Sequence, residues 1–267
     1  MSLGGLAGCE RLLVPAERAW PRIEIEVTIS PATPPPVEQL DNRRALVRLR
    51  TGGWIEIDRA SGRAAYLVHA PVSDDAIVHP FLAPVAIVVS HWHERESIHA
   101  GAFAVDGTVW GLVGDRLSGK SSLLAALATS GVDVLTDDLL VLDDLTAYAG
   151  PRTIDLRQDA AFALGQRESL GRAGARERWR LRLGAVPASA PIGGWIFAGW
   201  GDRIDLRRLR GVEVLERLLG SRGIRATPND PTRFLQLSAL PAWELQRPRS
   251  WSSLSQTVED MLSTIAD

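Results

Sequence analysis

The chain has 267 residues, 45% of them hydrophobic, and a formal net charge of -2, which argues against a general nucleic-acid-binding protein. Its single cysteine, Cys9, excludes an internal disulfide and fits a reducing cytosol. The N-terminus lacks the features of a signal peptide, and no apolar run approaches the ~18 residues of a membrane span, so we expect a soluble, cytoplasmic protein.

The first 95 residues are predicted to form a β-rich region packed on or beside a larger core. Alternation of apolar and polar residues predicts strands at 22–30, 45–50, 54–58 and 64–68, with the proline-rich stretch 31–36 as an extended linker. A helix is expected over 73–94, and we expect Pro80 and Pro84 to split or kink it.

Residues 96–267 are predicted to form the core, of α/β class. Two runs, 98–105 and 108–113, flank Asp106-Gly107, a strong hairpin signal. Further along, the sequence predicts strands at 132–136, 139–142 and 195–200 and helices at 121–130 and 207–219. The arginine-rich stretch 157–183 is interpreted as a loop with some helix, and apolar residues at helical spacing after Leu254 predict an amphipathic C-terminal helix.

The clearest motif is a phosphate-binding loop. Residues 114–121, Gly-Asp-Arg-Leu-Ser-Gly-Lys-Ser, match G-x-x-x-x-G-K-[ST] in full, with a strand predicted before them and a helix after. Backbone N–H groups of such a loop wrap phosphates, and the following helix N-terminus favours negative charge. The nucleotide-binding residues predicted here are Gly114, Asp115, Arg116, Leu117, Ser118, Gly119, Lys120, Ser121 and Ser122.

Lys120 is the only lysine among 30 basic residues. The bias towards arginine is typical of a GC-rich genome, yet this position has a chemical reason to stay lysine. A compact ammonium enters the curve of a phosphate loop, where a planar guanidinium does not fit.

Asp137 and Asp138 follow an apolar strand about seventeen residues after Lys120. Two carboxylates at a strand end allow one to hold Mg²⁺ and the other to take a proton from a hydroxyl, and a solvated strand end is the alternative. Asp143-Asp144 repeats the pattern but lies nearer to a predicted turn. The pair His91 and His93 lacks the cysteines and the helical spacing of a zinc site, and we interpret it as a helix end.

Taken together, Ile98-His99-Ala100-Gly101, the Asp106-Gly107 hairpin, the phosphate loop and Thr136-Asp137-Asp138 resemble the catalytic domain of HPr kinase/phosphorylase. The resemblance covers residues 97–145, extends to about residue 160 and is faint elsewhere. More narrowly, the chain looks like the shorter HPr kinase-related proteins of lasso-peptide and other peptide natural-product clusters, which phosphorylate a serine on a precursor peptide.

The resemblance implies a kinase core similar to phosphoenolpyruvate carboxykinase, with a mixed sheet and an antiparallel hairpin before the phosphate loop. It implies ATP and Mg²⁺ as cofactors, a serine-bearing peptide or protein as partner, and a homo-oligomer as a compatible state. By position, Lys120 and Ser121 would bind phosphates and Mg²⁺, and Asp137 and Asp138 would share metal binding and proton abstraction with His99 beside them.

The sequence departs from the family in two places. Arg116, Leu117 and Ser118 replace the family's Ser, Gly and variable residue, and Leu117 removes a flexible glycine. The Glu-Ile-Arg-Gly-x-Gly segment is missing; in the nearest stretch, Asp155 is a candidate second metal ligand and Arg152 a candidate phosphate contact. The first 95 residues also differ from the family's N-terminal domain, which disfavours phosphorylase activity and HPr itself as substrate.

Arginines of the 157–183 stretch could meet an acidic or carboxylate-bearing substrate or form a solvated loop. They are Arg167, Arg172, Arg176, Arg178, Arg180 and Arg182.

Three functions compete. The first is a serine kinase acting on a biosynthetic peptide or, less favoured, on HPr. The second is a nucleotide-binding regulatory or assembly protein without turnover. The third is a transport or motor ATPase, which lacks support because neither a Leu-Ser-Gly-Gly-Gln signature nor an Asn-Lys-x-Asp motif is present.

Overall fold

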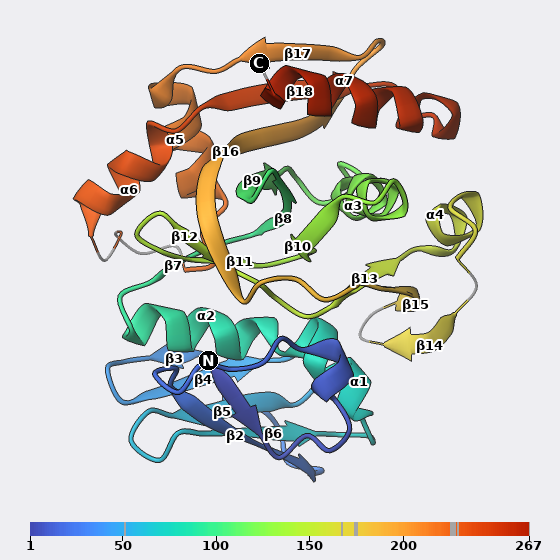
Figure 1. Cartoon of the computed structure of the whole chain (residues 1–267). Helices are drawn as coiled ribbons and strands as arrows, with labels where there is room; N and C mark the ends of the chain where they lie inside the picture. The colour runs from blue at the N-terminus through green and yellow to red at the C-terminus, as the bar shows by residue number, and fades with distance from the viewer. Residues whose placement is uncertain (51, 167, 174–175, 225–227, 229, 267) are drawn as a thin grey trace.

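The computed structural model describes residues 1–50, 52–166, 168–173, 176–224, 228 and 230–266. These residues form a mixed α/β fold with three β-sheets. Figure 1 shows the N-terminal sheet at the bottom of the view, helix α2 across its upper side, and the larger sheet above that helix.

The N-terminal sheet is mixed and has six strands. Its order is β1 (Ser2–Gly4), β2 (Arg22–Ile29), β6 (Arg63–Val68), β5 (Trp54–Asp58), β4 (Arg44–Arg48) and β3 (Gln39–Leu40). The pairs β1–β2 and β2–β6 are parallel, and the others are antiparallel. The four strands predicted before residue 70 are all present, whereas β1 and β3 are too short to give an alternation signal. A 3-10 turn, η1 (Glu10–Leu12), lies between β1 and β2.

The helix predicted at 73–94 is broken as expected. Its parts are α1 (Asp74–Ala76), η2 (Ile77–Phe81) and α2 (Ala83–Trp92). The break falls at His79, whose backbone is extended with φ of -151° before Pro80. Pro84 lies in the first turn of α2, where a proline leaves no helical hydrogen bond unmade. Apolar residues of α2 pack on the N-terminal sheet, and together they form a separate hydrophobic core.

The second sheet carries the phosphate loop. Its path runs β10 (Asp133–Thr136), β8 (Ala100–Val105), β9 (Thr108–Val113), β16 (Ser189–Trp200), β12 (Thr146–Tyr148), β11 (Leu140–Asp143) and β7 (Glu96–Ile98). Strand β18 (Ala242–Arg247) pairs with β16, and β17 (Asp205–Arg208) pairs with β18. Strands β8 and β9 are antiparallel through the two-residue turn Asp106-Gly107, with φ of 49° and 76°. Strand β9 is parallel to β16 on its other side.

Helices cover both faces of the second sheet. Helix α3 (Lys120–Thr129) and α7 (Leu254–Ala266) contribute to the core on one face. Helix α5 (Gly211–Gly220) and α6 (Pro231–Ser238) contribute to the core on the other. A short 3-10 turn, η3 (Trp251–Ser253), precedes α7. The helix predicted at 207–219 starts later, because residues 207–208 pair in β17 and Glu213 accepts a hydrogen bond from the Arg210 N–H at the helix start.

In the described residues of the stretch 157–183, the expected helix is present, but the expected loop is wrong because strands form there. The stretch holds α4 (Gln158–Ala163), β14 (Ser169–Ala173) and β15 (Arg176–Arg182), and β13 (Thr153–Leu156) completes an antiparallel sheet in the order β13-β15-β14. Arginine stands at every second position of β15, which is the period of a strand. The residues of β13 and η2 that these arginines contact are distant in sequence. The sequence pattern therefore gave no sign of those contacts, and the arginine-rich composition suggested a solvated segment. Arg167 lies outside the described residues.

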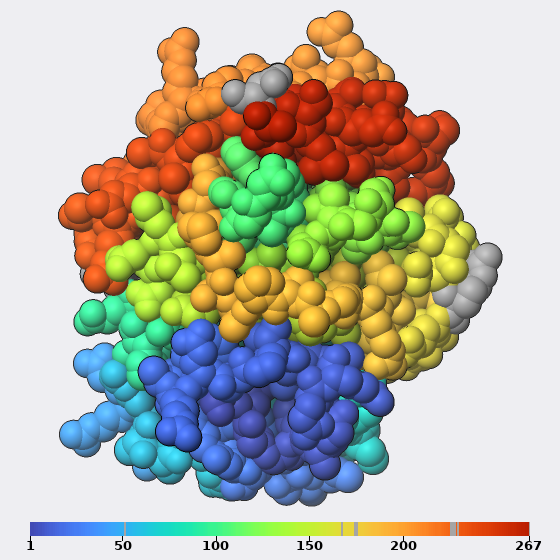
Figure 2. Space-filling model, viewed as in Figure 1, coloured from blue at the N-terminus to red at the C-terminus, as the bar shows by residue number. Residues whose placement is uncertain are grey.

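Arg180 joins the N-terminal region to the third sheet. Its side chain is fully buried, and its Nε and Nη2 donate to the two oxygens of Asp155 at 2.8 and 3.0 Å. The same guanidinium donates to the backbone oxygens of His79 (2.9 Å) and Asp75 (3.2 Å). Figure 2 shows the N-terminal part, in blue, directly against atoms of the core in yellow and orange.

Among the described residues, no single helix is long and apolar enough to cross a membrane. One bent pair, Asp74–Phe81 with Ala83–Trp92, meets those two criteria when its members are taken together.

We predict that Arg180→Met lowers the free energy of unfolding by about 3–5 kcal/mol, because it leaves the buried Asp155 carboxylate without its bidentate partner. Urea unfolding measures this loss. The matched control is Arg182→Met on the same strand, whose ion pair with Glu168 is exposed by 41% and 43% and is worth at most about 1 kcal/mol. Equal losses in the two variants would contradict the role given to Arg180.

Candidate functional site

The phosphate loop connects the end of β9 to the start of α3, and two glycines fix its path. A Cβ on Gly114 would lie 2.6 Å from the Ala198 oxygen and 2.7 Å from the Ser118 Oγ, too close for any side chain. Gly119 has φ of 80°, in the left-handed region, and its open side is filled by Arg247 and Trp200. Both glycines of the motif are therefore required by geometry.

Leu117 has a left-handed backbone, a conformation that glycine adopts without strain. Its φ is 72°, which costs a residue with a Cβ about 1–2 kcal/mol. The Trp200 Nε1–H donates to the Leu117 oxygen at 3.0 Å and holds the turn from outside the loop. Asp115, Arg116 and Leu117 are exposed, so this outer curve faces solvent.

Arg247 supports the loop from beneath, and nothing in the local sequence pattern pointed to it. Its Nη2 donates to the oxygens of Ser118 and Gly119, each at 3.2 Å. Its guanidinium lies 4.2 Å from the centroid of the Trp200 ring. The side chain is buried, and burial lowers the pKa of Arg247 to about 10. A single arginine at the end of a strand carries no motif, so only the three-dimensional contact reveals this residue.

Lys120, the first residue of α3, curls back over the loop. Its Nζ donates to the oxygen of Gly114 and lies 3.5 Å from that of Asp115. Burial lowers the pKa of Lys120, and the carboxylates of Asp138 and Asp137 oppose this shift. The ammonium therefore lies between the loop and the acidic pair. Ser121 and Ser122 follow in the first turn of α3, both half-buried.

Asp137 is the central acid of the site. It directly follows β10, which pairs with β8 beside the loop strand β9. Its side chain is buried, and its Oδ1 has no hydrogen-bond partner among the described residues. Burial raises the pKa of Asp137 to about 7, the charge of Asp138 adds to the shift, and a hydrogen bond from the Ser121 side chain opposes it. A buried carboxylate oxygen left unpaired is costly and is typical of a ligand-binding position.

Asp138 and His99 form an open pair beside Asp137. His99 Nδ1 and Asp138 Oδ1 are 3.4 Å apart, and the two side chains are 50% and 44% exposed. His99 stands between β7 and β8, where its backbone N–H donates to the Ser221 oxygen at 2.7 Å. The structure thus brings together Lys120, Asp137, Asp138 and His99, which sequence analysis had selected from three separate segments.

Asp155 and Arg152 have other roles than those expected from sequence. The Asp155 oxygens are taken by Arg180, and Arg178 Nη1 lies 3.4 Å from Oδ2. This carboxylate is thus neutralised by arginines, so Asp155 does not serve as the metal ligand expected from the sequence. Arg152 is buried and donates to the backbone oxygens of Val134, Leu135 and Gly184 at 2.7 to 3.0 Å. It joins β10 to the third sheet and leaves no group directed at a phosphate.

The arginines of the third sheet also turn inward. Arg176 Nη2 donates to the backbone oxygen of Asp155 at 3.3 Å, and Arg178 Nε donates to the backbone oxygen of Ala173 at 2.9 Å. Arg182 pairs with Glu168 on the surface. Within the described strands, Arg172 on β14 and Arg182 on β15 are the exposed arginines of that set. The expected substrate-facing arginine cluster is therefore mainly an internal network around Asp155.

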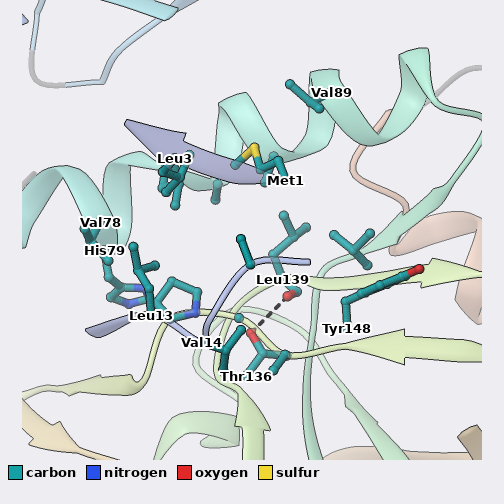
Figure 3. Close-up of a pocket in the computed structure, with 18 of the residues that line it drawn as sticks. Met1, Leu3, Leu13, Val14, Val78, His79, Val89, Thr136, Leu139 and Tyr148 are labelled. Atoms are coloured by element: carbon teal, nitrogen blue, oxygen red, sulfur yellow. Dashed lines mark hydrogen bonds between the residues drawn. The ribbon is translucent and has the colours of Figure 1, made fainter. Parts of the chain in front are cut away.

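A cavity of about 370 Å³ opens beside the acidic pair. Asp137, Asp138 and Thr136 line one part of it, and the N-terminal segment and α2 line the opposite wall. Figure 3 shows Met1, Leu3 and Val89 on one side and Thr136, Leu139 and Tyr148 on the other. The Thr136 hydroxyl donates to the Leu139 oxygen at 2.9 Å and so shapes the chain just after the acids.

The residues of the site suit a metal such as Mg²⁺, which phosphates and waters help to coordinate, better than a metal coordinated by protein side chains alone. Within the described ranges, no group of three or more His, Cys, Asp or Glu side chains is arranged to hold a metal ion. Mg²⁺ commonly binds one or two carboxylates together with phosphates and waters. Ser121 and Asp137, with Asp138 beside them, are the side chains that would hold it here, and the unpaired Oδ1 of Asp137 supports this assignment.

We predict that Asp137→Asn raises the free energy of unfolding relative to the wild type, and that this gain increases as the pH rises. With a pKa moved from 3.8 to about 7, the carboxyl is protonated in the folded protein while it is already ionised in the unfolded chain. Its cost to stability therefore appears above pH 4, grows to roughly 4 kcal/mol near pH 7 and then stays constant.

Neutral asparagine removes that pH dependence. Urea unfolding of both proteins at pH 5 and pH 8, in chelator and without nucleotide, should give a larger advantage for the variant at pH 8. A difference that does not change with pH would contradict the burial of a carboxylate at this position.

Comparison with models of known protein families gives no match, and comparison with curated protein sequences gives none either. Among solved structures, the chain is similar to the HPr(Ser) kinase/phosphatase from Coxiella burnetii. The similarity covers 64% of this chain and 92% of that one, at 12% sequence identity and a TM-score of 0.33.

Proposed function

We propose that this protein is an ATP-dependent phosphotransferase that phosphorylates a serine hydroxyl of a peptide or protein. The observation that carries the proposal is the position of Asp137 and Asp138. Both line the cavity, and both interact electrostatically with Lys120 of the phosphate loop. A nucleotide bound to the loop and a hydroxyl in the cavity would therefore meet at the acidic pair.

The chain's own groups divide the work. Loop N–H groups and Lys120 bind and orient the phosphates, and the N-terminus of α3 stabilises their charge. Bound Mg²⁺ would neutralise negative charge that develops on the transferring group. Asp138 accepts the proton of the attacking hydroxyl and His99 holds its carboxylate in place. The serine oxygen forms a new bond to the γ-phosphorus. The bond between the γ-phosphorus and the oxygen that bridges it to the β-phosphate breaks, and ADP leaves with that electron pair.

The competing function is a nucleotide-binding protein without turnover. Such a protein requires the phosphate loop, but it requires no carboxylate that faces a cavity for a second substrate. One feature favours turnover: the cavity beside the acids, which a protein that only binds a nucleotide does not need.

A ribosomally made precursor peptide, of lasso type, is the proposed substrate, with HPr as the alternative. The missing Glu-Ile-Arg-Gly-x-Gly segment and the different N-terminal region, which forms a wall of the cavity, disfavour HPr. Mass spectrometry of candidate peptides and of HPr after incubation with ATP and Mg²⁺ would identify the phosphorylated serine.

We predict that Asp138→Asn binds ATP with nearly unchanged affinity but loses phosphoryl transfer by about 10²-fold or more, because the variant cannot accept the hydroxyl proton. Binding is measured with a fluorescent nucleotide and transfer by mass spectrometry. The matched control is Asp144→Asn, an exposed aspartate of the next acidic pair that is bonded to Arg233 at 2.7 Å. Unchanged transfer in Asp138→Asn would remove the acidic pair from the mechanism.

We predict that Lys120→Ala weakens nucleotide binding and transfer together, because the loop loses its only ammonium. A tenfold or greater rise in the dissociation constant for ATP is the expected result in the same fluorescence assay. Full affinity in this variant would contradict the role of the loop itself.

A further inference from the structure

The cavity beside the acidic pair is apolar over most of its wall. Most of the residues that line it are hydrophobic, and they come from separate segments; examples are Leu3, Leu13, Val78, Leu82, Leu139 and Val141. A water-filled channel for a polar acceptor would not be lined in this way, because exposed apolar surface is unfavourable unless something apolar covers it. Its volume of about 370 Å³ lies within the range of small-ligand sites.

Two sets of polar groups in the cavity lie apart from each other, and Ser2, Glu10 and Ser90 also belong to its lining. At one end stand Asp137, Asp138 and the buried His79. At the other, Tyr148 packs edge-on against Trp20 at 5.6 Å between ring centroids. Figure 3 shows His79 and Tyr148 at opposite sides of the labelled residues, with Leu139 between them. A ligand with one hydroxyl end and an apolar body would match this order.

The charge of Arg95, which also lines the cavity, is already paired. Arg95 Nε donates to Asp143 Oδ2 at 3.0 Å, and the guanidinium lies 4.9 Å from the centroid of the Tyr148 ring. The Arg95 charge therefore needs no acidic group from a ligand. This pairing favours an aromatic or aliphatic body over an anionic one.

We infer that the cavity binds a bulky apolar side chain adjacent to the serine that receives the phosphate. The inference rests on the proposed kinase function and defines its substrate class: a hydroxyl flanked by an aromatic or aliphatic residue. Ala83 and Ala86 of α2 line the cavity, and their small side chains leave the space that such a residue fills.

The test uses two cavity-filling variants, Ala86→Leu and Ala83→Leu, which place larger side chains in the cavity from α2. The control is Ala163→Leu, the same change at an exposed position of α4. Thermal melting establishes that each variant is folded. The substrates are acetylated, amidated Phe-Ser-Phe and Gly-Ser-Gly peptides. N-acetylphenylalaninamide, which has no hydroxyl to phosphorylate, serves as a binding probe followed by NMR.

We expect kcat/KM to be at least tenfold higher for the Phe-Ser-Phe peptide in the wild-type protein and in Ala163→Leu. Both cavity variants should lose this preference and the probe signal while retaining ATP binding. Equal kcat/KM for the two peptides, or a preference that survives both variants, would overturn the inference and leave the kinase assignment standing. Phosphorylation of neither peptide nor any candidate substrate, with ATP still bound, would overturn the kinase function and this inference with it.

Discussion

The buried ion pair between Arg180 and Asp155 determines how the parts of this molecule meet. An ion pair removed from water is stable only if its hydrogen-bonding groups are satisfied, and Arg180 also donates to the backbone oxygens of Asp75 and His79. These bonds fix the turn before α2 against the third sheet. Because α2 forms one wall of the cavity, the same interaction positions that wall, and Asp155 also lies near enough to Asp137 to influence the pKa of its carboxyl.

Asp137 shows the opposite balance between stability and function. Its carboxylate is buried without a partner for Oδ1, next to the charge of Asp138, and both conditions disfavour ionisation. Asp155, equally buried, has every oxygen paired with arginine. The contrast between these two aspartates separates a structural carboxylate from one left free for a ligand, which the sequence does not distinguish.

The part of the site between residues 98 and 138 could be predicted because its signals are local. The Asp-Gly turn, the glycines and lysine of the loop, and the acids after an apolar strand each depend on neighbours in sequence. Other features depend on distant contacts and were missed: the inward arginines of β15, the support of the loop by Arg247, and a cavity lined by separate segments. The alternate spacing of arginines in β15 is a strand signal, but charge at four positions obscured it.

The loop's shape also has a consequence for the order in which the protein can be made. Trp200 holds Leu117 across 83 residues of sequence, and Arg247 holds Ser118 and Gly119 across 129 and 128. A ribosome exposes the motif itself long before these supports, and the left-handed backbone of Leu117 is unfavourable for a residue with a Cβ unless contacts hold it. A nascent chain that ends before β18 would carry the complete motif without the contacts from Arg247 that hold Ser118 and Gly119.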